Sequence, residues 1–125
     1  MGVIRRKDQL TAELAKPQGG FSGDADQRTI HAQTEPRPVR VSFVHFQPGT
    51  ITHWHSHGGG QVLHVLDGEG RTQSWGGKVE LLRPGDTVTA APGEKHWHGA
   101  VQGSEMTHLA VTIGEVNWQE SVDQG

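Results

Sequence analysis

Tight-turn residues divide this chain into short segments, and this division constrains the fold more than any other feature. Gly accounts for 18 of the 125 residues and Pro for 6. After a first turn at position 48, turn signals recur from position 68 onward at roughly 8–12-residue intervals, the spacing of β-sandwiches and small barrels. The turns are Pro48-Gly49, Gly68-Glu69-Gly70, Gly76-Gly77, Pro84-Gly85, Pro92-Gly93 and Gly103-Ser104. The sequence therefore predicts an all-β fold.

The segments between the turns have the residue alternation of β-strands. In residues 39–46, apolar side chains occupy both alternating positions, which predicts a strand covered on both faces. Gly76-Gly77 predicts a two-residue hairpin, and Gly103-Ser104 predicts a hairpin that joins the last two strands. The predicted strands are residues 39–46, 61–67, 71–75, 78–82, 87–91, 96–102 and 105–113.

A chain of 125 residues predicts one domain, which the pattern divides into three parts. Residues 1–36 are polar and weakly patterned, so we expect an N-terminal arm or peripheral strand. A short helix within residues 8–16 is expected to end at Pro17. Residues 37–114 are expected to form the barrel, and residues 115–125 a C-terminal tail with one or two helical turns.

Composition excludes several classes of protein. The chain has no Cys, which rules out disulfides, thiolate metal sites and cysteine nucleophiles. Lys and Arg number 11 against 14 Asp and Glu, so no basic face for nucleic acid is expected. No apolar run approaches the ~18 residues that cross a bilayer, and residues 1–16 lack the apolar stretch of a signal peptide. We therefore expect a cytoplasmic protein that binds neither nucleic acid nor membranes.

Histidines are concentrated in one half of the chain, where seven of the nine fall between His53 and His108. His53, His55 and His57 follow one another at every second position, so in a strand they share one face. His96 and a further histidine at position 98 repeat this spacing downstream. Neutral imidazole suits Mn, Fe, Co, Ni, Cu and Zn. The cluster predicts a site for a divalent transition metal, although each histidine alone is also compatible with a structural role.

Glycines at fixed distances frame these histidines. The first motif consists of Gly49, His55, His57, Gln61 and Gly68, and the second of Gly85, Gly93 and His96. This spacing resembles the two conserved motifs of the cupins over about residues 39–113. The chain departs from the family at Gln61, where cupins have Glu, at Pro92, which is one place late, and at Ala100, where cupins have Asn. The resemblance implies a double-stranded β-helix, or jelly-roll, barrel with one divalent metal per chain. It assigns the metal to His55, His57, Gln61 and His96, and leaves His53 near the mouth.

A narrower resemblance involves the residues around both motifs and the last predicted strand. The segments are Trp54-His55-Ser56-His57, Pro92 to Ala100 and Met106-Thr107-His108-Leu109-Ala110. They are similar to the small manganese cupins that act as hydroxynitrile lyases and also use Gln as a ligand. This resemblance implies Mn as the first choice of metal, with Fe, Ni, Co or Zn as alternatives. It also implies that His108 is catalytic.

Gln61 determines the charge of the expected site. Three neutral imidazoles and a neutral amide leave a divalent metal with its full charge of +2. Such a metal is a stronger Lewis acid toward anions. Its trivalent state is harder to reach, because no anionic ligand offsets the added charge. The ligand set therefore favours deprotonation, lyase or cyclisation reactions over metal oxidation.

Strand alternation extends the site beyond the ligands. His98 has the same parity as His96, so it either points inward as a second catalytic group or lies at the rim. The expected pocket consists of Ser42, Val44, Phe46, His53, Met106 and Ala110. His45 and His64 are interpreted as structural, and Trp54 and Trp97 as packing on the outer face or as part of a subunit interface.

These observations favour a metal-dependent lyase for a small-molecule substrate, with His108 exchanging a proton while the metal binds the developing anion. The alternatives are a dioxygenase of the quercetinase type, a polyketide cyclase, and a non-enzymatic cupin that binds a small anion or a sugar. The resemblance also implies a homodimer or larger homo-oligomer.

Overall fold

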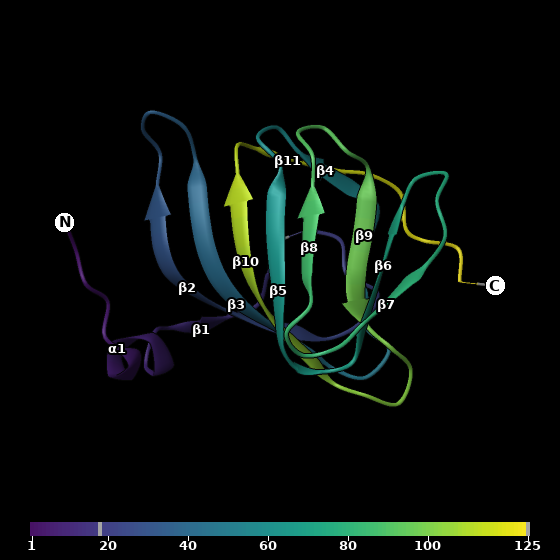
Figure 1. The fold of residues 1–125 in the computed structure, drawn as a ribbon, viewed down its shortest axis with the longest axis horizontal. Helices are drawn as coiled ribbons and strands as arrows, with labels where there is room; N and C mark the ends of the chain where they lie inside the picture. Colours follow the sequence, from purple (N-terminus) through teal and green to yellow (C-terminus); the bar gives the residue numbers. More distant parts are fainter. Residues whose placement is uncertain (18, 125) are drawn as a thin grey trace.

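Two antiparallel sheets form the walls of a barrel in the computed structural model, which describes residues 1–17 and 19–124 (Figure 1). The larger sheet has the order β1 (Leu14–Ala15), β2 (Ala25–Gln33), β3 (Val39–Phe46), β10 (Met106–Ile113), β5 (Gln61–Gly68) and β8 (Thr87–Ala90). The smaller sheet has the order β11 (Val116–Trp118), β4 (His55–His57), β9 (His96–Ala100), β6 (Gly70–Ser74) and β7 (Glu80–Leu82). The predicted all-β barrel is confirmed.

One end of the barrel interior is filled by apolar side chains. Phe46 lies opposite Met106 in the β3–β10 register, and both pack with Val65 and Leu82. At the other end of the same two strands, Arg40 lies opposite Thr112. The interior is therefore closed at its apolar end, and its polar side chains gather toward the opposite end.

The prediction that β3 is covered on both faces is wrong. Its inward side chains, Ser42, Val44 and Phe46, are buried, whereas Val41 and Phe43 on the outer face are only half-buried. Burial on one side of an antiparallel sheet is sufficient to keep such a strand in place.

Both predicted hairpins differ from the structure. β6 pairs with β7 only from Gly70–Leu82 to Thr72–Glu80, and the loop between the two strands spans residues 75–79, which is longer than the predicted two-residue turn. β9 and β10 do not pair with each other, because β9 joins β4 and β6 while β10 joins β3 and β5. The turn at Gly103-Ser104 instead carries the chain from one sheet to the other.

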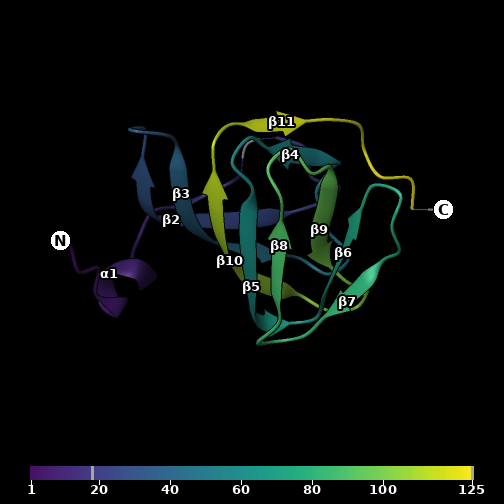
Figure 2. The same cartoon turned by 45° about the horizontal axis from the view of Figure 1, so that its top comes forward.

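The two terminal segments belong to the sheets. β2 pairs with β3 along most of its length, so this part of the predicted arm is a peripheral strand. The helix α1 (Arg6–Leu10) begins earlier than predicted, has no buried residue and lies beside the barrel (Figure 1). The predicted helical tail is wrong, because β11 lies along β4 across the barrel (Figure 2). Gln18 and Gly125, which belong to the predicted arm and tail, lie outside the described residues.

Two glycines allow close backbone approaches that a side chain would block. Gly68 has a φ of 76°, and a Cβ there would lie 1.8 Å from the carbonyl oxygen of Glu105. A Cβ at Gly99 would lie 2.4 Å from the carbonyl oxygen of Thr50. These glycines let the β5–β6 turn approach the backbone at Glu105 and let strand β9 approach the backbone at Thr50.

In the part of the chain that the structure describes, no helix combines the length and apolar character that crossing a bilayer requires.

Candidate metal centre

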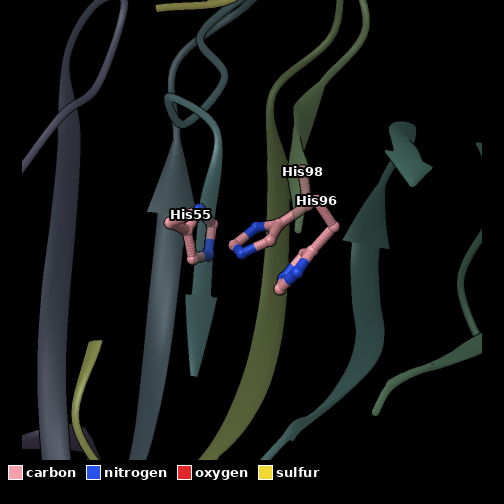
Figure 3. A group of neighbouring side chains, drawn as sticks. All are labelled: His55, His96 and His98. Atoms are coloured by element: carbon pink, nitrogen blue, oxygen red, sulfur yellow. The ribbon is translucent and has the colours of Figure 1, made fainter. Parts of the chain in front are cut away.

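Strands β4 and β9 bring three histidine rings together inside the barrel. His55 lies opposite His96 in the register of these strands, and His98 is the next inward residue of β9. Figure 3 shows the rings of His96 and His98 extending from β9 toward His55. One nitrogen of each ring lies within 4.8 Å of one nitrogen of each of the others. All three residues are buried, and the group could bind a metal ion.

The other two predicted ligands adjoin this group. The ring centroid of His57 lies 5.0 Å from that of His55 and 5.9 Å from that of His96. The Gln61 amide nitrogen donates to Thr112 Oγ1 at 3.1 Å, and the amide oxygen lies 3.0 Å from His96 Nε2. The structure therefore brings together all four predicted ligands, and it adds His98, which the sequence assigned to catalysis.

Backbone carbonyls orient two of these rings. His55 Nδ1 lies 2.9 Å from the carbonyl oxygen of His53, and His96 Nδ1 lies 2.9 Å from the carbonyl oxygen of Glu94. A neutral ring that donates from Nδ1 has its lone pair on Nε2, which is the arrangement that metal-binding histidines adopt.

Burial keeps these imidazoles neutral. Burial, together with the positive charge that a protonated His96 would carry, lowers the pKa of His55 to about 3 and that of His57 to about 4. Burial also lowers the pKa of His96. At neutral pH each ring therefore keeps the lone pair that a metal requires.

Several buried nitrogens in this group have no protein partner. Both ring nitrogens of His57 and the Nε2 of His98 are buried and make no hydrogen bond in the described part of the chain. Buried polar atoms are rarely left unpaired, because removing them from water costs free energy. A divalent transition metal fits this donor set, since neutral nitrogen ligands suit it and coordination would use one of the unpaired nitrogens of His57.

The buried histidines predict a stability that falls in acid. The folded-state pKa values of His55, His57 and His108 lie near 3 to 4, below the ordinary value of 6.5. The unfolded chain therefore binds more protons as the pH falls below about 6.5, and the free energy of unfolding decreases by up to about 1.4 kcal/mol per pH unit for each ring. We expect urea unfolding of the metal-free protein at pH 7 and pH 5 to show a loss of several kcal/mol. Equal stability at both values would contradict the assignment of neutral buried rings.

His98 and His108 form a second, linked pair. His108 Nε2 lies 3.2 Å from His98 Nδ1, and both residues are buried. Burial lowers the pKa of His108 to about 4 and, together with the neighbouring histidines, lowers the pKa of His98 well below its ordinary range. The ring of Phe46 contacts both imidazoles edge-on at centroid distances of 5.2 and 5.9 Å. Both imidazoles are therefore neutral, and the ring of Phe46 packs against them.

An open cavity of about 890 Å³ leads to the histidines. The predicted residues Ser42, Val44, Phe46 and Ala110 line it, together with the His98–His108 pair.

Two predicted pocket residues lie elsewhere. Met106 is 1% exposed and packs in the apolar core, because its inward position falls at the closed end of the barrel. His53 precedes strand β4, so strand alternation does not apply to it. Its ring instead packs so close to Gly20 that a Cβ there would lie 2.0 Å from Nδ1.

The structure adds cavity residues that the sequence analysis missed. Arg40 and Thr112 line the open end, and continuing the inward alternation of their strands would have identified both. Trp118 lies with its ring centroid 4.7 Å from that of His55. No sequence signal pointed to Trp118, because its segment was expected to be helical. Trp54 and Trp97 pack with Ile51 and Val122 in a cluster separate from the barrel core, as predicted for outer-face residues.

Comparison with known proteins places these features in context. Residues 42–113 match the family model described as Cupin domain. The chain is 42% identical over 110 residues to an (R)-mandelonitrile lyase of Granulicella tundricola, covering 85% of this chain and 84% of that protein. Its fold matches the crystal structure of a cupin-like protein of Thermotoga maritima with a TM-score of 0.81 and 34% identity, over 88% of this chain and 87% of that one. It also matches a polyketide cyclase of Streptomyces resistomycificus with a TM-score of 0.76 and 17% identity, over 98% and 88% of the two chains.

Proposed function

Because this chain belongs to the cupin domain family, we propose that its histidine cluster is the active site of a metal-dependent lyase that cleaves and forms cyanohydrins. The observation that carries the proposal is the neutral His98–His108 pair, which lies directly beside a donor set that fits a divalent metal. The similarity to a mandelonitrile lyase supports the choice of reaction.

We assign the metal to His55, His57, Gln61 and His96, with manganese as the first choice. A divalent ion held there by neutral ligands supplies positive charge that stabilises an anion formed on the substrate. His98 is the alternative fourth imidazole, since its ring belongs to the same group.

The His98–His108 pair would move the substrate proton. Two neutral rings carry two protons on four nitrogens, and one proton occupies the bond between His108 Nε2 and His98 Nδ1. Of the two nitrogens outside this bond, His108 Nδ1 and His98 Nε2, one is then always unprotonated. When His108 Nε2 is the donor of this hydrogen bond, His108 Nδ1 is unprotonated and can accept a proton. When His98 Nδ1 is the donor, His98 Nε2 is unprotonated and can bind a metal. The two tautomers therefore correspond to the two roles considered for His98, as a partner of the base or as the alternative metal ligand.

Cyanohydrin cleavage follows from the first tautomer. In the proposed reaction the substrate hydroxyl gives its proton to the unprotonated Nδ1 of His108, which is buried and makes no hydrogen bond to the described part of the chain. The hydroxyl oxygen then becomes the carbonyl oxygen of the aldehyde. The carbon–carbon bond breaks, and its electron pair leaves with cyanide. Cyanide then takes a proton from the pair and departs as hydrogen cyanide. Phe46 shields the two rings, so the proton stays with the pair between the two steps.

The test is the conversion of mandelonitrile to benzaldehyde by the manganese-loaded protein, followed by ultraviolet absorbance. We expect turnover well above that of the metal-free protein and of free manganese, with the (R)-enantiomer consumed first on chiral chromatography. Turnover equal to that of the two controls would contradict the lyase assignment.

The size of the cavity favours a cyclase as the second candidate. A volume of about 890 Å³ lies near the upper end of the range for drug-sized ligands, and benzaldehyde fills only part of it. Cyclisation uses the same proton transfer at a carbon acid. Binding of polycyclic phenols, measured by fluorescence quenching, would support this second function if mandelonitrile is not converted.

Gln61→Glu is expected to hold metal more tightly and to bind anions less well. The side chain keeps its shape, and the Thr112 hydroxyl can donate to the new carboxylate in place of accepting from the amide. A carboxylate binds a divalent ion better than an amide oxygen, but it lowers the charge of the site from +2 to +1. Release of metal to a chelator should therefore become slower, and azide should bind more weakly.

Gln33→Glu is the matched control, because it adds the same charge to the lining of the cavity, away from the histidine cluster. Unchanged metal release and unchanged azide affinity in Gln61→Glu would show that Gln61 does not bind the metal.

A further inference from the structure

One arginine faces the open end of the cavity. Arg40 continues the inward alternation of β3 beyond Ser42 and Val44, and it lines the cavity. Apart from the histidines, Glu115 is the only other ionisable side chain among the described cavity residues. In the described part of the chain, the guanidinium of Arg40 makes no hydrogen bond and no ion pair. Arg40 is therefore the one permanent cation among the described cavity residues, and a guanidinium without a protein partner at the mouth is positioned to meet an incoming anion.

The sheet register places Arg40 at a defined separation from the histidine cluster. Arg40 lies opposite Thr112, and Thr112 lies opposite Gln61, so these three residues form one row across β3, β10 and β5. Neighbouring strands lie about 4.8 Å apart, which puts the Cα atoms of Arg40 and Gln61 about 10 Å apart. The two residues thus lie on separate strands of one row, and a benzene ring with a polar group at each end is a simple probe of this arrangement.

Polar side chains line the open end of the cavity, which suits a polar group of a ligand. Gln33 and Thr34 line it beside Arg40, whereas Val44, Phe46 and Ala110 line the part near the histidines. A substrate that is apolar in the middle and polar at its far end would fill this arrangement.

We propose that Arg40 determines specificity by binding a carboxylate at the far end of the substrate, opposite the reacting carbon. The planar guanidinium matches a carboxylate with two parallel hydrogen bonds. Glu115 at the same rim lowers the local positive charge, which favours a monoanion over a more highly charged phosphate. The assignment of the reacting end rests on the proposed function.

The experiment compares two unreactive alcohols that differ only in this group, 4-(hydroxymethyl)benzoate and benzyl alcohol. Binding to the manganese-loaded protein is measured by calorimetry for the native chain, Arg40→Gln and Arg37→Gln. Arg37 is an exposed arginine near the start of the same strand and does not line the cavity. We expect the native protein and Arg37→Gln to prefer the benzoate by about tenfold, which corresponds to one charged hydrogen-bond pair. Arg40→Gln should lose this preference, and Glu115→Gln should increase it.

Three outcomes would overturn the proposal: no preference in the native protein, a preference that survives Arg40→Gln, or a preference that disappears on metal removal in the native chain. The last outcome would mean that the metal binds the carboxylate. The binding assay does not depend on turnover. Failure to convert mandelonitrile, with the preference intact and dependent on Arg40, would therefore reject the lyase reaction and retain the role of Arg40.

Discussion

His96→Ala is expected to reduce the bound metal from about one equivalent per chain to a small fraction at neutral pH. His96 belongs to the predicted ligand set and to the group whose nitrogens converge in the structure. Loss of a residue that only supports a ligand already weakens binding by about 10–100-fold, so loss of a ligand should cost more. His55→Ala should behave in the same way. Inductively coupled plasma mass spectrometry after dialysis measures the metal content.

The same measurement decides between His57 and His98 as the remaining imidazole ligand. We expect His57→Ala to lose metal and His98→Ala to keep it. The opposite result would assign the ligand role to His98 and leave the two unpaired nitrogens of His57 unexplained. His64→Ala is the control, because His64 lies on the outer face of β5 and hydrogen-bonds Thr87. Full metal content in both His55→Ala and His96→Ala would reject the metal centre.

His108→Ala is expected to lower the rate of cyanohydrin cleavage by roughly 10²–10⁴-fold while the metal content stays unchanged. The substitution removes one ring of the pair that accepts the substrate proton, and His108 does not belong to the group of converging nitrogens. Turnover and metal content are measured on the same preparation. His53→Ala should have a much smaller effect, because its ring packs against Gly20 outside the cavity.

A structural role of His108 predicts a different result. The ring is 1% exposed and contacts Phe46, so its removal could instead destabilise the core. His108→Gln fills most of the space and keeps a hydrogen-bonding group near His98, but it cannot accept a proton at neutral pH. A folded His108→Gln protein with native thermal stability and native turnover would show that His108 is not the base.

Local sequence was sufficient for the type of fold and for most strands. Turn residues and residue alternation depend on neighbours along the chain, so residues 39–46 and 87–91 were placed almost correctly. The position of His55 and His57 on one face follows from the same two-residue period. Burial of Ser42 and Val44 on the inner face of β3 also followed from this period.

The errors have a common physical cause, because each depends on contacts between distant segments. Gly103-Ser104 has the chemistry of a hairpin turn, yet β9 and β10 find their partners in different sheets. The tail became strand β11 because β4 offered it an unpaired edge, which outweighs a weak local preference for helix.

Only the tertiary structure determines which inward-facing residues lie at the closed apolar end of the barrel and which lie at the open polar end. Period and parity placed His108, Met106 and Ala110 on one face, but they carry no information on depth. The register of β10 against β3 puts Met106 in the closed apolar end and His108 beside His98. The same register brings Arg40 into line with Gln61 across two strand pairings. Sequence alternation specifies which side of a sheet a residue faces, whereas cross-strand hydrogen bonding decides which residues meet.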